Sequence, residues 1–245
     1  TKVTEEIDEC PEGKVYNSEL DECECPSGKF ENNNGKCVTD CTVFDEVIKN
    51  VINMEGGFVN DQADPGGPTN KGVSWKIWSK YSNSILGISP TLQNLQSLND
   101  NQAKKIYKAI FWDSISADDI NDGDLRYLLF DFHVNAGTNA IKVLQKTLNQ
   151  LGSNINVDGH IGTQTLQAIN DYSNQVNLYN MFKTNRISYY NRITQSSINT
   201  FKDKNPNATQ TQINSRTFQK FINGWLNRTN HFKNKTSTDN YNVNC

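Results

Sequence analysis

The sequence lacks a long apolar run, an excess of basic residues and a high apolar content. No apolar stretch approaches the roughly 20 residues that cross a bilayer, which argues against a membrane-spanning helix. The formal net charge is −3 and the pI is near 5.6, so the overall composition provides no basic field to attract nucleic acid or an anionic cell wall. Only 35% of the residues are hydrophobic, yet 245 residues suffice for a core in one large domain or two small ones.

Histidine is also scarce, with three residues in the chain. His133 has no second ligand at metal spacing, so we interpret it as structural and expect neither a metal nor an organic cofactor. The chain begins at Thr1 rather than at Met. This start suits a mature secreted product without its signal peptide, although a truncated start would look the same. We therefore expect a secreted, extracellular protein.

Cysteine is present in an even number, six, with five clustered near one end and the sixth at position 245, which favours an oxidising compartment. Two copies of one pattern, Cys-Pro-x-Gly-Lys, begin at Cys10 and Cys25 and are closed by Cys23 and Cys37. Each copy is too short to hold a core and needs a covalent staple. Residues 1–41 are therefore predicted to form a separate disulfide-stapled repeat module.

The simplest disulfide pairing closes each repeat on itself, Cys10 with Cys23 and Cys25 with Cys37. Cys41 and Cys245 then remain, and we predict that they join the end of the chain to the base of the first long helix. Zinc ligation is the alternative, but Cys-x-Cys without a nearby His fits a structural zinc poorly. The module could bind a partner, link copies into a homo-oligomer or filament, or only extend the particle.

A helix is predicted to follow this module. Thr42 is a suitable N-cap, and Gly56-Gly57 ends the segment. Apolar residues recur at three- and four-residue spacing; they are Phe44, Val47, Ile48, Val51 and Ile52. Glu55 lies eleven residues after Phe44, three turns on and about 20° from this stripe, so it points where the core does.

A carboxylate on an apolar face needs a reason. Glu55 is either salt-bridged at the edge of a cleft, or a general acid whose pKa is raised by partial burial. Asp64 follows nine residues later, in a loop whose prolines and glycines let the backbone pass close to a ligand. Glycosidic hydrolysis requires two such acids, one to protonate the leaving oxygen and one to orient water.

Residues 55–73, Glu-Gly-Gly-Phe-Val-Asn-Asp-Gln-Ala-Asp-Pro-Gly-Gly-Pro-Thr-Asn-Lys-Gly-Val, resemble the signature of the family 108 glycoside hydrolases, bacterial and phage N-acetylmuramidases of lysozyme-like fold. The resemblance implies that Glu55 is the catalytic acid. The spacing of Glu55, Asp64 and Thr69 is also similar to the Glu-x8-Asp-x5-Thr triad of T4-type phage lysozymes, although Thr69 comes one residue early.

Further blocks resemble the same family in the same order. Residues 106–113 look like its Tyr-x3-Tyr/Phe-Trp block, and residues 131–137 like the Asp-x-x-Val-Asn-x-Gly segment at its cleft floor. Residues 186–193 and 221–228 resemble its closing blocks, Arg-x-x-Tyr-Tyr and Phe-x-x-Gly-Trp-x-x-Arg. Residues 157–166 look like the Val-Asp-Gly-x-x-Gly-x-x-Thr turn of peptidoglycan-binding helical domains, which folding alone would also explain.

Several residues in these blocks have two interpretations. Trp75 could line a sugar cleft or pack in the core. Asp131 and Asn135, four apart on one helical face, could bind sugar amides or brace the helix end. The default interpretation of the helically spaced aromatic residues near the C-terminus is packing; they are Phe218, Phe221 and Trp225.

Three sequons begin at Asn207, Asn227 and Asn234. They could carry N-glycans in a eukaryotic source, and an Asn-rich chain would also contain about this many by chance.

Together these features predict a mainly α-helical, lysozyme-like fold. Residues 1–41 form the cysteine-rich module, residues 42–137 the catalytic region, and residues 138–245 a helical peptidoglycan-binding-like region packed on it. The expected partner is peptidoglycan or a related GlcNAc-containing glycan, and no nucleic acid is expected.

The expected activity is hydrolysis of the β-1,4 bond between N-acetylmuramic acid and N-acetylglucosamine. Glu55 would protonate the leaving oxygen, Asp64 would hold or activate water, and Thr69 and Asn70 would shape the water site. The alternative is that the fold was recruited as an extracellular structural or filament-forming subunit. The acidic balance, the cysteine-rich arm and the sequons are not needed by a diffusing wall hydrolase.

Overall fold

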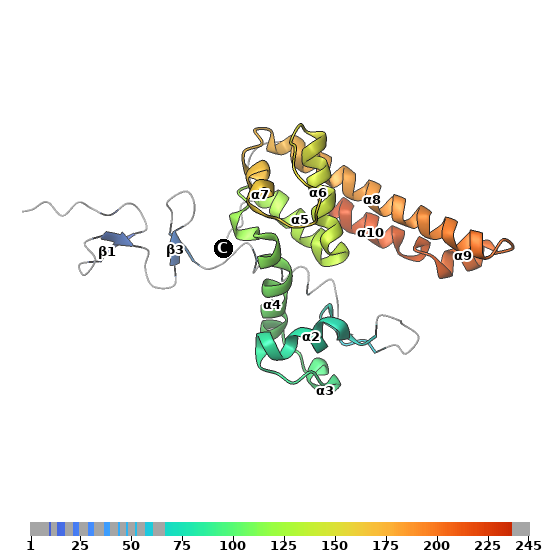
Figure 1. The fold of residues 1–245 in the computed structure, drawn as a ribbon. Helices are drawn as coiled ribbons and strands as arrows, with labels where there is room; N and C mark the ends of the chain where they lie inside the picture. Colours follow the sequence, from blue (N-terminus) through green and yellow to red (C-terminus); the bar gives the residue numbers. More distant parts are fainter. Residues whose placement is uncertain are drawn as a thin grey trace, which may run out of the picture. The chain divides into compact units, whose positions relative to one another are not determined.

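The computed structural model describes residues 10, 14–17, 22–24, 29–31, 37–39, 44, 48, 52, 57–60 and 67–236. The chain divides into two compact units, Thr1–Asn50 with Val243–Cys245, and Val51–Asn242. The fold is mainly helical, as predicted (Figure 1). Three of the predicted disulfide cysteines, Cys25, Cys41 and Cys245, lie outside the described residues.

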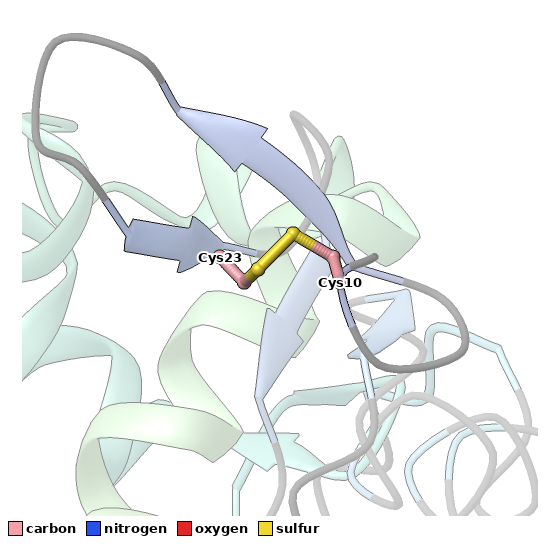
Figure 2. The surroundings of a disulfide bond; sticks show 2 residues. All are labelled: Cys10 and Cys23. Carbon is pink, nitrogen blue, oxygen red and sulfur yellow. A yellow bond between two sulfur atoms is a disulfide. The ribbon is translucent and has the colours of Figure 1, made fainter. Parts of the chain in front are cut away.

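The first unit contains one antiparallel hairpin for each cysteine repeat. Strand β1 (Val15–Asn17) pairs with β2 (Glu22–Glu24), and β3 (Lys29–Glu31) pairs with β4 (Cys37–Thr39). A disulfide joins Cys10 to Cys23, whose Cα atoms are 5.6 Å apart, and closes the first repeat (Figure 2). The cross-link therefore spans a hairpin with three residues in each strand, which is too small to bury a core of its own.

The apolar stripe predicted after Thr42 is helical at its described positions. Phe44, Ile48 and Ile52 all lie in helix and are all buried. Four-residue spacing is that of one helical face, so burial at each of these positions agrees with the predicted apolar stripe.

The second unit begins with a short hairpin and three helices. Strands β5 (Thr69–Asn70) and β6 (Val73–Ser74) lead into α2 (Trp75–Leu86), α3 (Leu92–Gln96) and α4 (Asp100–Tyr107). Hydroxyl and amide side chains cap these helices: Ser74 accepts from the Ile77 amide, and Asn99 forms a capping box with Gln102. A π-helical turn, η1 (Lys108–Trp112), and two 3₁₀ turns, η2 (Asp113–Ile115) and η3 (Ala117–Asp119), follow.

Helix α5 (Gly123–Ala136) is the central element of this unit. Every residue from Leu128 to His133 is buried, and α5 contacts η1, α6 (Thr138–Gln150) and α8 (Gln175–Lys204). A helix apolar on all sides must be enclosed by neighbours. It ends at Gly137, whose φ of 57° and ψ of −143° lie in a region that side chains with a Cβ avoid.

The C-terminal helices form an arm. Helix α7 (Thr163–Asn170) is followed by α8, α9 (Gln210–Arg216) and α10 (Gln219–His231). Helices α8 and α10 lie side by side, and α9 lies at the far end of the pair (Figure 1). Within the described part of the chain, no helix is long and apolar enough to span a membrane.

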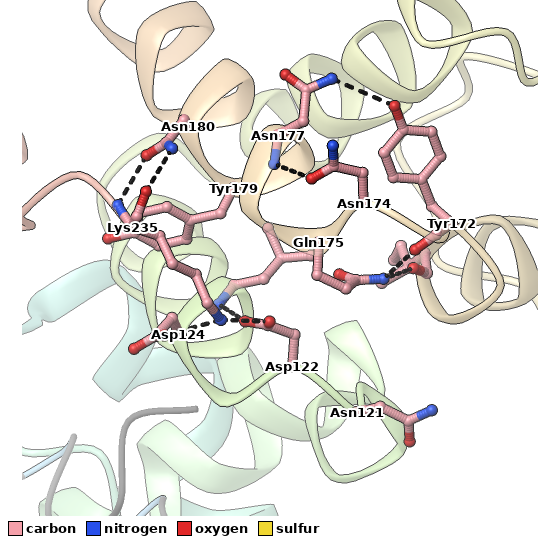
Figure 3. A network of polar contacts seen from close by, with 12 residues as sticks. Asn121, Asp122, Asp124, Tyr172, Asn174, Gln175, Asn177, Tyr179, Asn180 and Lys235 are labelled. Atoms are coloured by element: carbon pink, nitrogen blue, oxygen red, sulfur yellow. Dashed lines mark hydrogen bonds and ion pairs between the residues drawn. The ribbon is translucent and has the colours of Figure 1, made fainter. Parts of the chain in front are cut away.

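The segment after α10, residues 232–236, returns to the start of α5, and we call it the C-terminal strap. The Lys235 ammonium lies 2.5 Å from the Asp122 carboxylate and 3.0 Å from that of Asp124, and its backbone bonds with the Asn180 amide (Figure 3). Tyr179 donates to the Lys233 carbonyl at 3.1 Å. The strap thus joins the end of the arm to the first turn of the central helix.

Candidate active site

The two acids predicted to carry catalysis, Glu55 and Asp64, lie outside the described residues. The structure does describe parts of the chain that lie between Glu55 and Asp64 and shortly after Asp64, and we call these parts the frame. This frame consists of residues 57–60, residues 67–70 and the hairpin that leads into α2. Its geometry determines where the Asp64 loop begins and ends.

A β-bridge closes the Asp64 loop. The Val59 amide donates to the Thr69 carbonyl at 2.8 Å, and the Thr69 amide donates to the Val59 carbonyl at 2.9 Å. Asp64 stands midway between the two bridge residues in the sequence. The bridge therefore fixes both ends of the loop, and Thr69, predicted to act in catalysis, holds one of them through its backbone.

A two-residue turn follows the loop. Thr69 pairs with Ser74 and Asn70 with Val73, which leaves Lys71 and Gly72 at the tip with φ values of 50° and 75°. Positive φ at both positions matches the turn types that connect two-residue hairpins. Glycine tolerates this conformation easily, whereas a lysine in it needs support from its surroundings.

Two contacts supply this support at Lys71. Its ammonium lies 2.6 Å from the Asp100 carboxylate, and its carbonyl accepts from the Tyr107 hydroxyl at 3.3 Å. Both partners belong to α4, so this helix holds the turn from the side, and one of them, Tyr107, is part of the next family-like block. The hairpin is thereby a rigid base for the loop that precedes it.

Asn70, predicted to contact substrate, holds the hairpin to α3 through its side-chain nitrogen, and its contact with substrate stays a prediction. Its side chain is buried, and its Nδ2 donates to the Leu95 carbonyl at 2.8 Å and to the Gln96 carbonyl at 3.1 Å. Both amide protons are therefore used within the protein. Asn70 positions the site, and its side-chain nitrogen has no proton left for a sugar.

The two tryptophans of α2 differ in exposure. Trp78 is fully buried and donates from Nε1 to the Thr91 carbonyl at 3.0 Å, so it belongs to the core. Trp75 is half-buried, and its backbone amide donates to the Pro68 carbonyl at 2.7 Å. Trp75 thus adjoins the end of the Asp64 loop with part of its surface open, and its contact with sugar stays a prediction.

Asp131 is held inside the protein by two arginines. It is 2% exposed, and its oxygens lie 2.7 Å from Nη2 of Arg186 and 2.8 Å from Nε of Arg228. Arg186 is itself fully buried, with its guanidinium 5.0 Å from the centre of the Phe132 ring. Both oxygens of this carboxylate are paired within the protein, the arrangement that the bracing interpretation expects, and substrate contact by Asp131 stays a prediction.

Asn135 is part of the same brace. Its side-chain oxygen accepts from the Tyr190 hydroxyl at 2.7 Å, and the Tyr190 ring stacks on Trp225 with 5.0 Å between centroids. Burial raises the pKa of Tyr190, the largest influence on it, so the hydroxyl stays a donor. Together with the Asp131 contacts, this brings three family-like blocks, on α5, α8 and α10, to one place.

His133 lies on the opposite flank of α5. Its Nδ1 is 2.9 Å from the Gly137 carbonyl, which can only accept, so Nε2 is the acceptor that faces the Ser114 hydroxyl at 3.1 Å. Burial lowers the pKa of His133, and the backbone hydrogen bond to Gly137 offsets this only in part. The ring is therefore neutral and bridges α5 to η2, as its structural interpretation requires. Sequence reasoning gave no signal for Ser114.

The Val-Asp-Gly turn is organised by Gln145, a residue that sequence reasoning missed. Gln145 is fully buried on α6, donates to Asp158 at 2.8 Å and accepts from the Gly159 amide at 2.9 Å. Asp158 also accepts from the His160 amide; these hydrogen bonds, that from Gln145 first, lower its pKa. A pocket of about 310 Å³ opens beside the turn.

The predicted glycosylation sites differ in their surroundings. Asn207 is exposed between α8 and α9. The Thr229 of the second sequon is fully buried and donates to the Trp225 carbonyl, and the Asn234 side chain accepts from Lys183 at 2.8 Å. Thr209 of the first sequon caps α9, where its hydroxyl accepts from the Gln212 amide. Glycosylation at Asn207, Asn227 and Asn234 stays a prediction.

Across residues 67–236 and the shorter described stretches, no three His, Cys, Asp or Glu side chains gather as they would around a metal ion. The described residues of the frame contribute amide side chains, backbone groups and the half-buried Trp75 ring. These groups can position a glycan, and proton transfer would fall to the predicted acids.

Comparisons with known proteins match two consecutive parts of the chain. The family model for glycosyl hydrolase 108 matches residues 48–137, and a model described as a predicted peptidoglycan domain matches residues 139–230. The family resemblance drawn from the sequence is thus confirmed. The two descriptions indicate a glycoside hydrolase that acts on peptidoglycan.

One solved structure, that of Brucella abortus SagA, is similar with a TM-score of 0.57 and 24% identity over 77% of this chain and 90% of that chain. At this identity the likeness shows the fold. No curated protein matches the chain.

Proposed function

We propose that this chain, a glycosyl hydrolase 108 region followed by a peptidoglycan domain, is a secreted N-acetylmuramidase with Glu55 as its general acid. It would cleave the β-1,4 bond between N-acetylmuramic acid and N-acetylglucosamine. The observation that carries this proposal is the frame at residues 59–74. It holds the Asp64 loop by a bridge at its base and by a turn locked to α3 and α4.

In this mechanism the frame supplies position, one carboxyl group donates a proton and the other orients water. Glu55 would donate a proton to the leaving glycosidic oxygen, and Asp64 would hold the attacking water. Fixing the loop ends lowers the entropic cost of placing Asp64 against a bound strand. If the two carboxyl groups are about 6.5–9.5 Å apart, the product anomer is inverted.

The test is release of reducing sugar from purified peptidoglycan by the wild type and by Glu55→Gln. We expect turnover by the wild type and a loss of at least about a hundredfold in the variant, since general acid catalysis contributes roughly 10²–10⁴-fold. Asp171→Asn, at an exposed position after α7, is the matched acid-to-amide control and should retain activity. Mass spectrometry of the products identifies the cleaved bond from the sugar at the new reducing end.

Failure of the wild type to release sugar would contradict the proposed function. It would leave the alternative of an extracellular structural or filament-forming subunit that keeps the fold without the reaction. Light scattering separates these two outcomes, because a structural subunit assembles into large particles, whereas a diffusing hydrolase does not.

A further inference from the structure

The C-terminal arm is strongly basic, although the chain as a whole is acidic. Residues 172–236, which include α8, α9, α10 and the C-terminal strap, contain ten Lys or Arg residues and one acid, Asp203. Their net charge is +9, within a chain of net charge −3. The expectation that the protein offers no basic field is therefore wrong for this region. Charge separated in this way gives one part of a surface a potential that the total charge conceals.

A groove on the arm concentrates part of this charge. It encloses about 510 Å³ and is lined by residues from α8, by Arg216 at the end of α9 and by Phe218 before α10. We call it the arm groove. Arg192, Lys204 and Arg216 contribute three cations to its lining, Phe201 and Phe218 contribute phenyl rings, and the remaining lining residues include hydroxyl side chains.

The three cations of the arm groove have no carboxylate partner within ion-pair distance among the described residues. All three are exposed. In contrast, Arg186 and Arg228 of the same arm are both paired with Asp131. The arm thus uses some of its arginines to hold the fold and leaves those of the groove open to solvent.

Phe218, which lines the groove beside these cations, is an exposed phenyl ring. Phe218 is 43% and Phe221 46% exposed, so the packing expected from their spacing covers only part of each ring. Both rings lie 5.7 Å from the half-buried Trp225 ring, centroid to centroid. The Phe218 amide donates to the Ser197 hydroxyl at 3.2 Å, which fixes the position of this residue at the groove.

We infer that the arm groove binds an uncleaved peptidoglycan strand through the free carboxylates of its stem peptides. Guanidinium groups match carboxylates in geometry and charge. Phenyl rings offer apolar faces to the C–H groups of sugar rings, and hydroxyl side chains match sugar hydroxyls and N-acetyl groups. A polyanion that lacks sugar rings would bind better to a row of cations than to cations grouped around aromatic rings.

This inference rests on the proposed function for its ligand but assigns a binding site that uses other residues. All of the groove residues lie within residues 192–218, whereas the predicted acids are Glu55 and Asp64. Holding and cutting are therefore separable by substitution.

The test is co-sedimentation of the full chain with purified, insoluble cell wall. Arg192→Gln combined with Arg216→Gln should weaken binding about tenfold, since each exposed guanidinium–carboxylate pair contributes modestly. It should also reduce the loss of binding as salt is raised. Lys76→Gln combined with Lys146→Gln removes the same charge from exposed positions on α2 and α6 and should bind like the wild type.

Modified walls identify the ligand chemistry. Amidation of the wall carboxylates should weaken wild-type binding to the level of the arginine variant, and stripping phosphate polymers with hydrofluoric acid should leave binding unchanged. Equal binding by the wild type and the arginine variant would overturn the inference, as would binding that is lost only on removal of phosphate. Lys204→Gln provides an independent variant and should show a smaller loss in the same direction.

Hydrolysis by the same variants separates this inference from the proposed function. We expect Glu55→Gln to bind wall normally and release no sugar, and the arginine variant to cleave short soluble glycans at the wild-type rate. If the wild type releases no sugar while only the arginine variant loses wall binding, the proposed function fails and the groove assignment stands.

Discussion

Substitution of Asp131 by Asn gives the most direct test of the brace between α5 and the arm. The change preserves the shape of the side chain and removes only its charge, so no cavity complicates the result. It leaves the fully buried Arg186 without its carboxylate partner. Arg228 is affected less, because 16% of its side chain is exposed and its guanidinium can turn towards water.

The expected cost follows from these exposures. Breaking a buried ion pair by removing one partner lowers the free energy of unfolding by about 3–5 kcal/mol, a large share of the roughly 5–15 kcal/mol of a typical protein. The matched control is Asp113→Asn. The Asp113 carboxylate lies 2.6 Å from Lys108, closer than either arginine is to Asp131, but the Lys108 and Asp113 side chains are 37% and 52% exposed. We expect a cost below about 1 kcal/mol there.

Urea denaturation followed by circular dichroism and by tryptophan fluorescence measures both variants against the wild type. If Asp131→Asn lowers the free energy of unfolding by no more than Asp113→Asn does, the reasoning is refuted. Burial of the two charges would then not determine the strength of the ion pair more than the distance between them. A further variant combines Asp131→Leu with Arg186→Met. Replacing both charges by apolar groups should recover most of the stability that Asp131→Asn loses.

Three further substitutions test other parts of the structure. Lys235→Gln should lower the free energy of unfolding, measured in urea, by about 3 kcal/mol, because it leaves two carboxylates near the start of α5 without their ammonium. An unchanged urea midpoint would show that this ion pair does not stabilise the protein. Asn70→Ala should lower the free energy of unfolding by about 1–3 kcal/mol, since two carbonyls lose their donor; thermal denaturation checks this, and no shift in Tm would contradict it. The pKa of His133 is lowered by burial, so on acidification the unfolded state binds a proton at a higher pH than the folded state does. The stabilisation that neutral His133 provides is therefore complete above about pH 6.5 and declines as the pH falls below it. Urea midpoints at pH 7.5 and pH 5 should therefore fall less in His133→Gln than in the wild type, and equal falls would exclude a role for this ring.

The helices could be predicted from the sequence wherever apolar spacing is regular, as at residues 138–150. The ion pair between Asp131 and Arg186 could not be predicted, because the two residues are 55 positions apart. No local sequence pattern shows which cation a buried carboxylate pairs with. The family-like blocks showed that both residues belong to named motifs. Only the packing of α5 against α8 showed that the motifs hold each other.

Spacing also gave an incomplete prediction at Phe218 and Phe221. Helical periodicity shows that side chains share a face, but not whether a neighbouring element covers that face. In the arm, Phe218 and Phe221 stand at the start of α10, just after α9 in the chain, and their rings remain partly exposed. The net charge misled for a related reason, since a sum over the chain contains no information about where the charges lie.

The C-terminal strap limits how the chain can be divided. The match to the peptidoglycan domain ends at residue 230, five positions before the lysine that is seated among carboxylates near the start of α5. A fragment cut at that boundary would leave the hydrolase half with an uncompensated pair of negative charges and the arm without its anchor. The two halves are thus physically interlocked, although a sequence comparison separates them.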